Sequence, residues 1–291
     1  MKYTFDHDFH IHSKLSLCSN DPEQNAERIL RYASENGLKQ ICVTDHFWDS
    51  TVDGASGWYK QQDFEHISSI LPLPQGDGIK FMFGAETDMD KFMTLGTAKQ
   101  TFDKFDFVII PTTHLHMKGF TISEEDAATP ESRAKVWLSR LSALLDMDLP
   151  FHKIGIAHLA CELIAPTREE YLRVLELLPS EKLEELFAKC ANVGVGIELN
   201  FSDMSFADSE ADTVLRMFKI AKEVGNPFYK YISYGIGLVF FVQVFINIGV
   251  VIGLLPVTGI TLPIISYGGT SLMISLMMIG LIINISKYRG D

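Results

Sequence analysis

The stretch FDHDFHIHS, residues 5–13, decides how the first part of this 291-residue chain is interpreted. A β-strand is expected over residues 4–9, and His10 and His12 follow it. Because side chains two positions apart point to the same face of an extended chain, these two imidazoles lie side by side. Such a pair can chelate a metal ion or merely stack, so the rest of the sequence must discriminate between the two.

Similar β-rich runs recur along the chain and alternate with amphipathic stretches. We expect helices over about 22–36, 131–146, 168–193 and 209–224, the first capped by Asp21 and ended by Gly37. Residues 48–78, rich in glycine and proline, are expected to be irregular. The alternation predicts an α/β fold with a parallel sheet. The further strands are expected at 40–44, 80–84, 107–110, 154–157 and 196–199.

Metal-ligand side chains follow nearly every one of these strands. In a βα-barrel the carboxyl ends of all strands meet on one face, where active sites lie, so five such ends argue for one multinuclear centre. Imidazoles with a carboxylate suit zinc, manganese or iron better than magnesium or calcium. The candidate ligands are His10, His12, His46, Glu86, His114 and His158, with Cys18, Asp21, His116 and Glu198 as weaker candidates.

Two carboxylates in these motifs could have a role at the metal centre or an ordinary structural role. Asp45 could orient an imidazole from behind, or it could cap the turn that follows it. Glu198 and Asn200 could face the centre, or only satisfy nearby backbone groups.

An amidohydrolase barrel also uses an H-x-H strand, but no lysine stands at a strand end here to bridge two metals.

Charge divides the chain near Tyr229. Residues 229–291 hold three basic residues and one acidic residue, which leaves 22 basic and 36 acidic residues in 1–228, a net charge of −14. The acidic first part argues against nucleic acid as a partner, because phosphate backbones need a basic surface. Four scattered cysteines and the absence of a signal-like start favour a reduced, cytoplasmic environment.

The motifs DFHIHS, TDHF, GAE, THLH, AHLA and GIELN, in this order over 1–228, resemble the PHP (polymerase and histidinol phosphatase) domain family. The resemblance implies a distorted βα-barrel with two or three divalent metal ions that hydrolyses phosphate esters of a small substrate. It assigns metal-ligand roles to the six main candidates above. Family members normally add a last strand ending in Asp-x-His, and the chain turns hydrophobic where that strand should begin, so we expect an incomplete barrel with impaired activity.

Residues 231–286 carry no charged side chain. A run of 24 such residues would span about 36 Å as a helix, more than the roughly 30 Å of a bilayer core. We therefore expect a transmembrane hairpin with helices at about 232–255 and 270–285. Flanking lysines and Arg289 place both termini in the cytoplasm by the positive-inside rule.

The segment QVFINIGVVIGLLPVTG, residues 243–259, and the motif SYGG, residues 266–269, resemble the end of the SEDS family, the RodA/FtsW group of cell-wall glycosyltransferases. The match covers only the last two spans of about ten, without the loop that carries the family's catalytic acid. Three interpretations follow: a membrane-tethered PHP-type phosphoesterase, a non-catalytic fragment associated with cell-wall synthesis proteins, or a chimeric join of two parts without a common function.

Overall fold

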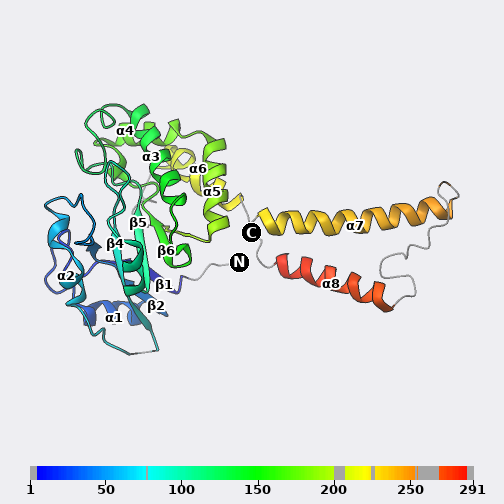
Figure 1. Cartoon of the computed structure of the whole chain (residues 1–291), viewed down its shortest axis with the longest axis horizontal. Coiled ribbons are helices and arrows are strands. Elements are labelled where there is room, and N and C mark those ends of the chain that lie inside the picture. Colours follow the sequence, from blue (N-terminus) through cyan, green and yellow to red (C-terminus); the bar gives the residue numbers. More distant parts are fainter. Residues whose placement is uncertain are drawn as a thin grey trace. The chain divides into compact units, whose positions relative to one another are not determined.

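The computed structural model describes residues 5–76, 78–199, 207–223, 227–252, 254 and 269–286. The chain divides into two compact units, 1–220 and 221–291. The first unit holds a parallel sheet, curled like part of a barrel, and its helices (Figure 1). The expected α/β fold with an incomplete barrel is thus confirmed for this unit.

The sheet follows the order β1-β2-β4-β5-β6-β7, with β3 paired to β4, and every pair is parallel. Its strands are short apolar runs, as expected of a sheet covered on both faces. The core side chains Ile41, Val43, Val108, Ile110 and Ile156 are fully buried. The strands are β1 (His7–Ile11), β2 (Gln40–Val43), β3 (His46–Phe47), β4 (Lys80–Thr87), β5 (Phe107–Pro111), β6 (Ile154–Ala157) and β7 (Gly196–Ile197).

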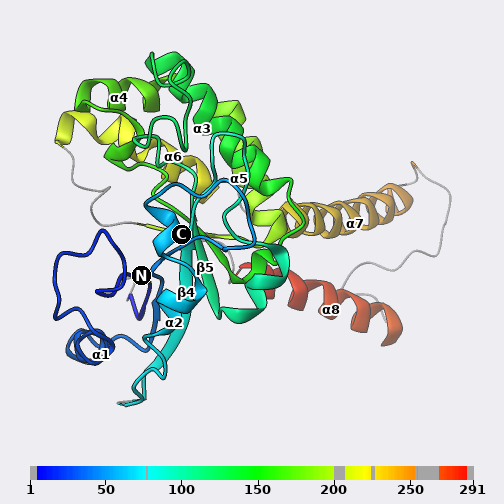
Figure 2. The same cartoon turned by 60° about the vertical axis from the view of Figure 1, so that its left-hand side comes forward.

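The helices pack beside this sheet. Figures 1 and 2 both show α3 to α6 as one group, with α1 apart from it near β2. Short 3₁₀ turns lie at Tyr59–Gln61, Lys99–Lys104, Phe151–Lys153, Glu162–Ile164 and Asp208–Glu210. The first unit's helices are α1 (Ala26–Glu35), α2 (Phe64–Ser68), α3 (Pro130–Leu145), α4 (Arg168–Leu177), α5 (Ser180–Val193) and α6 (Ala211–Glu223), the last running into the boundary between the units.

Several expected boundaries were wrong for local reasons. Helix α1 begins at Ala26 because Asn25, not Asp21, accepts the capping hydrogen bond. The helix expected over 168–193 is two helices, because Pro179 cannot supply the backbone N–H that a continuous helix needs. Strand β1 starts three residues later than expected. Strand β3 was missed because two residues are too few to show the alternation that marks a strand.

The second unit contains α7 (Pro227–Val251) and α8 (Gly269–Ser286), which contact each other. The helices expected at 232–255 and 270–285 therefore appear as helices, although 255 lies outside the described residues, as does the loop with Pro256 and Gly268. Within the described residues, no helix combines the length and the hydropathy that crossing a bilayer requires.

Candidate metal centre

Glu86 is the centre of the site. It lies near the end of β4, fully buried, and the register of the sheet sets it directly beside His46 of β3. Neither oxygen of its carboxylate has a hydrogen-bond partner in the described part of the chain. Imidazole nitrogens surround it instead. Oε2 lies 3.3 Å from His10 Nε2, 3.1 Å from His12 Nε2 and 3.0 Å from His46 Nδ1, and Oε1 lies 4.0 Å from His114 Nε2 and 3.9 Å from His158 Nε2.

Three of these imidazoles are oriented by a hydrogen bond at the ring nitrogen that faces away from Glu86. His10, His12 and His114 each present Nε2 to Glu86 and use Nδ1 for a hydrogen bond to another side chain. Such a bond at the far nitrogen fixes the ring and its tautomer and leaves the near nitrogen free as a ligand.

His12 is oriented through Ser16. The Ser16 hydroxyl donates to Asp45 Oδ1 over 2.8 Å, so its oxygen accepts from His12 Nδ1, also over 2.8 Å. The same oxygen accepts from the backbone N–H of His46. Asp45 also accepts two hydrogen bonds from Ser13. Among the described residues, Asp45 makes no hydrogen bond to an imidazole and acts on His12 through Ser16, which carries no recognisable sequence signal.

His114 is oriented by a buried ion pair that sequence analysis also missed. Its Nδ1 donates to Asp88 Oδ2 over 2.9 Å, and Arg140 Nη2 donates to Asp88 Oδ1 over 2.7 Å. All five N–H groups of Arg140 have acceptors, the others being backbone carbonyls of residues 89, 90, 112 and 121. A buried charge with every donor satisfied forms a rigid support for the imidazole.

Glu198 completes the support on the other side of the site. It follows β7 and accepts a hydrogen bond from His10 Nδ1 over 2.6 Å and one from the backbone N–H of His158 over 3.1 Å. His158 has a left-handed backbone with φ of 59°, uncommon for a residue other than glycine and typical of constrained functional positions. Glu198 thus hydrogen-bonds both a candidate ligand and a backbone group.

Burial and charge act against each other in this cluster. Burial opposes ionisation of Glu86, but the imidazoles of His46 and His10 outweigh it and hold the pKa of Glu86 well below its usual value. Burial likewise opposes protonation of His10, yet Glu86 and Glu198 raise its pKa to about 10. For His46 and His158 burial prevails and lowers the pKa values to about 3 and about 4. The neutral imidazoles of His46 and His158 are the donor forms that a cation needs, whereas His10 has to release a proton before it can bind one.

A cavity of about 740 Å³ opens onto these residues. Its remaining walls are largely apolar, formed among others by Trp58, Met117, Phe120 and Leu163. No lysine or arginine lines it within the described part of the chain. An anionic ligand there would therefore meet no lysine or arginine of the described residues.

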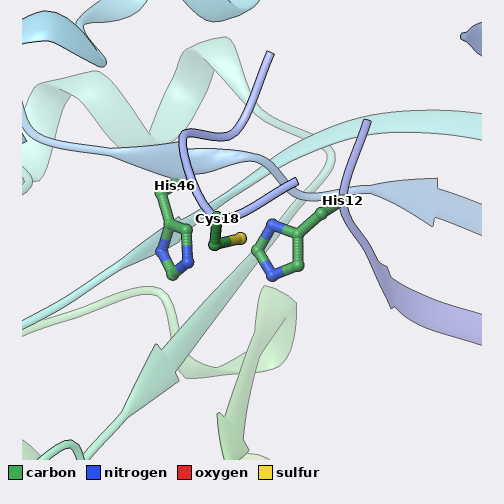
Figure 3. A group of neighbouring side chains, drawn as sticks. All are labelled: His12, Cys18 and His46. Atoms are coloured by element: carbon green, nitrogen blue, oxygen red, sulfur yellow. The ribbon is translucent and has the colours of Figure 1, made fainter. Parts of the chain in front are cut away.

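Of the weaker candidates, some line the cavity and others do not. Cys18 lies in the cavity wall near the rings of His12 and His46, which stack on each other with centroids 4.5 Å apart (Figure 3). His116 lines the cavity as well but belongs to none of the potential ligand groups among the described residues. Asp21 is paired with Arg28 at 2.6 Å, away from this cluster, and Asn200 lies outside the described residues.

The donor set fits transition-metal ions. The described residues contain four groups of side chains, and within each group the potential ligand atoms lie within 4.8 Å of one another. Their donors are imidazoles, carboxylates and a thiol, which zinc, iron and manganese use. A buried carboxylate without hydrogen bonds, ringed by imidazoles, is the arrangement expected of a ligand that bridges cations. The groups are His10, His12 and Glu86; Glu86, His114 and His158; His10, His158 and Glu198; and His12, Cys18 and His46.

Comparison with known proteins separates the two parts of the chain. A family model described as PHP domain matches residues 8–202, and one described as cell cycle protein, for the FtsW, RodA and SpoVE group, matches residues 213–291. Both resemblances noted in the sequence are thereby confirmed.

Curated relatives match the second part. A probable peptidoglycan glycosyltransferase FtsW from Geobacter metallireducens is 44% identical over 78 residues, which cover 26% of this chain and 21% of that protein. Stage V sporulation protein E from Bacillus subtilis is 48% identical over 73 residues, which cover 25% and 20%. The chain thus spans about a fifth of the length of these relatives.

Proposed function

Because the chain belongs to the PHP domain family, we propose that its first unit is a metal-dependent phosphoesterase that acts on a small phosphorylated substrate. The proposed ligands of two or three divalent cations are His10, His12, His46, Glu86, His114 and His158. The observation that carries the proposal is the carboxylate of Glu86, buried without hydrogen bonds among five imidazoles.

The chemistry follows from these donors. When bound, divalent cations of this kind activate a water molecule for in-line attack and neutralise charge that builds on the phosphoryl oxygens. The protein's own part is orientation, since Asp45 through Ser16, Asp88 with Arg140, and Glu198 hold three imidazoles in place.

The lining of the cavity also favours one class of substrate. Since no lysine or arginine of the described residues lines it, we expect the phosphoryl group to depend on the cations for its binding. The apolar walls around Trp58 and Phe120 exclude water and favour an ester whose alcohol part is compact and weakly charged. A single phosphomonoester fits this cavity better than a polyphosphate, which would need further cationic groups.

The test uses the full-length protein in mild detergent with p-nitrophenyl phosphate. We expect slow hydrolysis that a chelator abolishes and manganese or zinc restores, and loss of both metal and turnover in His10→Ala and Glu86→Gln. The matched control is His152→Ala, outside the cluster. Protein that binds no transition metal under these conditions would overturn the proposal.

For the second unit we propose insertion into a lipid bilayer, with the first unit and the C-terminus cytoplasmic. The support is the uncharged run 231–286 and the exposed side chains of α7, which include Leu238, Phe241, Phe245 and Ile248. Similarity to proteins named as peptidoglycan glycosyltransferases makes cell-wall synthesis proteins the natural partners. Recovery of the full-length protein in the soluble rather than the membrane fraction of cells would contradict this.

A join of two parts without a common function remains the competing proposal, because each family match covers only one part. The nucleotide sequence across codons 225–235, read on single long molecules together with its transcript, distinguishes them. A continuous, transcribed reading frame would rule out an assembly error as the origin of the join, and separate frames would support it.

A further inference from the structure

Part of the cavity wall is an aromatic surface that begins beside the candidate metal ligands. The ring of Trp58 meets the imidazole of His46 edge-to-face, with centroids 4.8 Å apart, and His46 Nδ1 lies 3.0 Å from Glu86 Oε2. Tyr59 packs edge-to-face on Trp58 with centroids 4.8 Å apart, and Phe120 packs against Tyr59 at 5.5 Å. All three rings line the cavity. A ligand held at the proposed cations therefore lies within reach of aromatic rings.

A second layer of side chains holds this aromatic wall in place. Trp48 is buried behind it, with its ring centroid 5.6 Å from that of Tyr59 and 5.4 Å from that of Phe120. Its indole N–H donates to the carbonyl of Val52. The indole also packs so closely on Gly96 that a Cβ at that position would lie 2.5 Å from it. Because the wall is ordered before a ligand arrives, binding loses less side-chain entropy.

Trp58 differs from the two other tryptophans in the hydrogen bonding of its indole. The indole N–H groups of Trp48 and Trp137 donate to backbone carbonyls, whereas that of Trp58 has no hydrogen-bond partner among the described residues. The Trp58 side chain is also only half-buried. Its backbone is anchored, since the fully buried Gln62 donates to the Trp58 carbonyl and accepts from the N–H of Leu17. The position of Trp58 is thus fixed while its indole stays available to a ligand.

We propose that Trp58, Tyr59 and Phe120 form a subsite for an uncharged, planar aromatic ring in the alcohol part of the substrate. The inference deepens the proposed phosphoesterase function and rests on it. Aromatic rings make tilted and offset contacts with one another that a saturated ring of similar size does not reproduce. A second anionic group on the substrate would meet no lysine or arginine of the described residues in this cavity. Because Trp58 lies beside His46, the ring has to be close to the phosphorus, as in an aryl or arylmethyl phosphate.

The experiment measures the binding of two non-hydrolysable phosphonates to the manganese-loaded, full-length protein in mild detergent by calorimetry. Benzylphosphonate carries a planar ring, and cyclohexylmethylphosphonate carries a saturated ring of similar size. We expect benzylphosphonate to bind about 2- to 10-fold more tightly, the range that one aromatic contact contributes beyond burial. Trp58→Leu should remove this preference by weakening the binding of benzylphosphonate alone, whereas Trp58→Phe should retain it. The manganese content should be the same in both variants as in the unsubstituted protein.

The matched control is Phe92→Leu, the same kind of change at a side chain that is 77% exposed and outside the cavity, and it should keep the preference. Equal, metal-dependent affinities for the two phosphonates would refute the aromatic subsite and leave the phosphoesterase proposal standing. A preference that persists in Trp58→Leu, or a loss of manganese from that variant, would contradict the role of Trp58 in ligand binding. Binding of neither phosphonate by the manganese-loaded protein would overturn both proposals.

Discussion

The imidazole Nδ1 of His10 donates a hydrogen bond to Glu198 Oε1 over 2.6 Å, and the two residues lie 188 positions apart. His10 belongs to β1 and Glu198 follows β7, the two edge strands of the described sheet. One hydrogen bond therefore connects the edges that backbone pairing leaves open.

Replacing Glu198 by alanine should weaken both the metal centre and the closure of the sheet. His10 would lose the acceptor that orients it, and His158 would lose the partner of its backbone N–H. We expect metal affinity to fall about 10–100-fold, and the free energy of unfolding to fall by about 1–3 kcal/mol. Metal competition with a coloured chelator and urea unfolding measure the two effects. The exposed Glu184→Ala on α5 is the control, and equal affinity in both variants would contradict the role of Glu198.

Ser16→Ala should reduce metal affinity with little change in fold. The variant removes the hydroxyl through which Asp45 orients His12, so the imidazole can adopt the other tautomer or rotate. We expect zinc binding about 10–100-fold weaker. Ser68→Ala, at a half-buried position at the end of α2 outside the cavity, should bind zinc as the unsubstituted protein does. Unchanged affinity in Ser16→Ala would show that the orientation of His12 does not depend on this hydroxyl.

Arg140→Met should destabilise the first unit strongly. The variant leaves Asp88 buried and charged without its cation, and breaking a buried pair from one side costs about 3–5 kcal/mol. Tryptophan fluorescence in urea measures this, because all three tryptophans lie in the first unit. The exposed Arg31→Met should stay within about 0.5 kcal/mol of the unsubstituted protein. A midpoint for Arg140→Met equal to that of Arg31→Met would refute the structural role.

Gly84→Ala should also be destabilising, for a steric reason. A methyl group at this position of β4 would lie 2.3 Å from the Phe107 carbonyl oxygen and 2.7 Å from Cys42 Sγ. Because one of these atoms is backbone of the neighbouring strand, β4 and β5 would have to separate, at a cost of about 1–3 kcal/mol or more. Gly57→Ala has no atom within 4 Å of the added group and is the control. Urea unfolding of the two variants compares them directly.

Because the thiol of Cys190 is buried, we expect the folded state to lose stability at alkaline pH. Burial raises the pKa of Cys190 to about 12. A pKa raised in the folded state contributes stability that is present below the unfolded value of 9.0 and is lost as pH rises toward 12. Stability should therefore decline from about pH 9 upward, less steeply in Cys190→Ala. At pH 8 iodoacetamide should modify Cys190 only after unfolding in urea, which mass spectrometry of the peptides would show.

Local pattern was enough to foresee much of the site. His10, His46, His114 and His158 stand just after or at the ends of short apolar runs, and parallel strands bring such ends together whatever their separation along the chain. Composition alone likewise separated the acidic, histidine-containing part from the uncharged run 231–286.

Sequence by itself thus determined the α/β fold, the position of the metal-ligand candidates and the two family resemblances, because each depends on local periodicity or on the order of motifs. Only the tertiary structure decided which polar groups stand behind those candidates. Ser16 and Asp88 carry no local signal, since a serine or carboxylate in a turn has many ordinary uses, and Glu198 was only a weaker candidate at a strand end. Their role exists only because strands β1, β4 and β5 and the residues after β7 converge and leave each imidazole one acceptor on its far side.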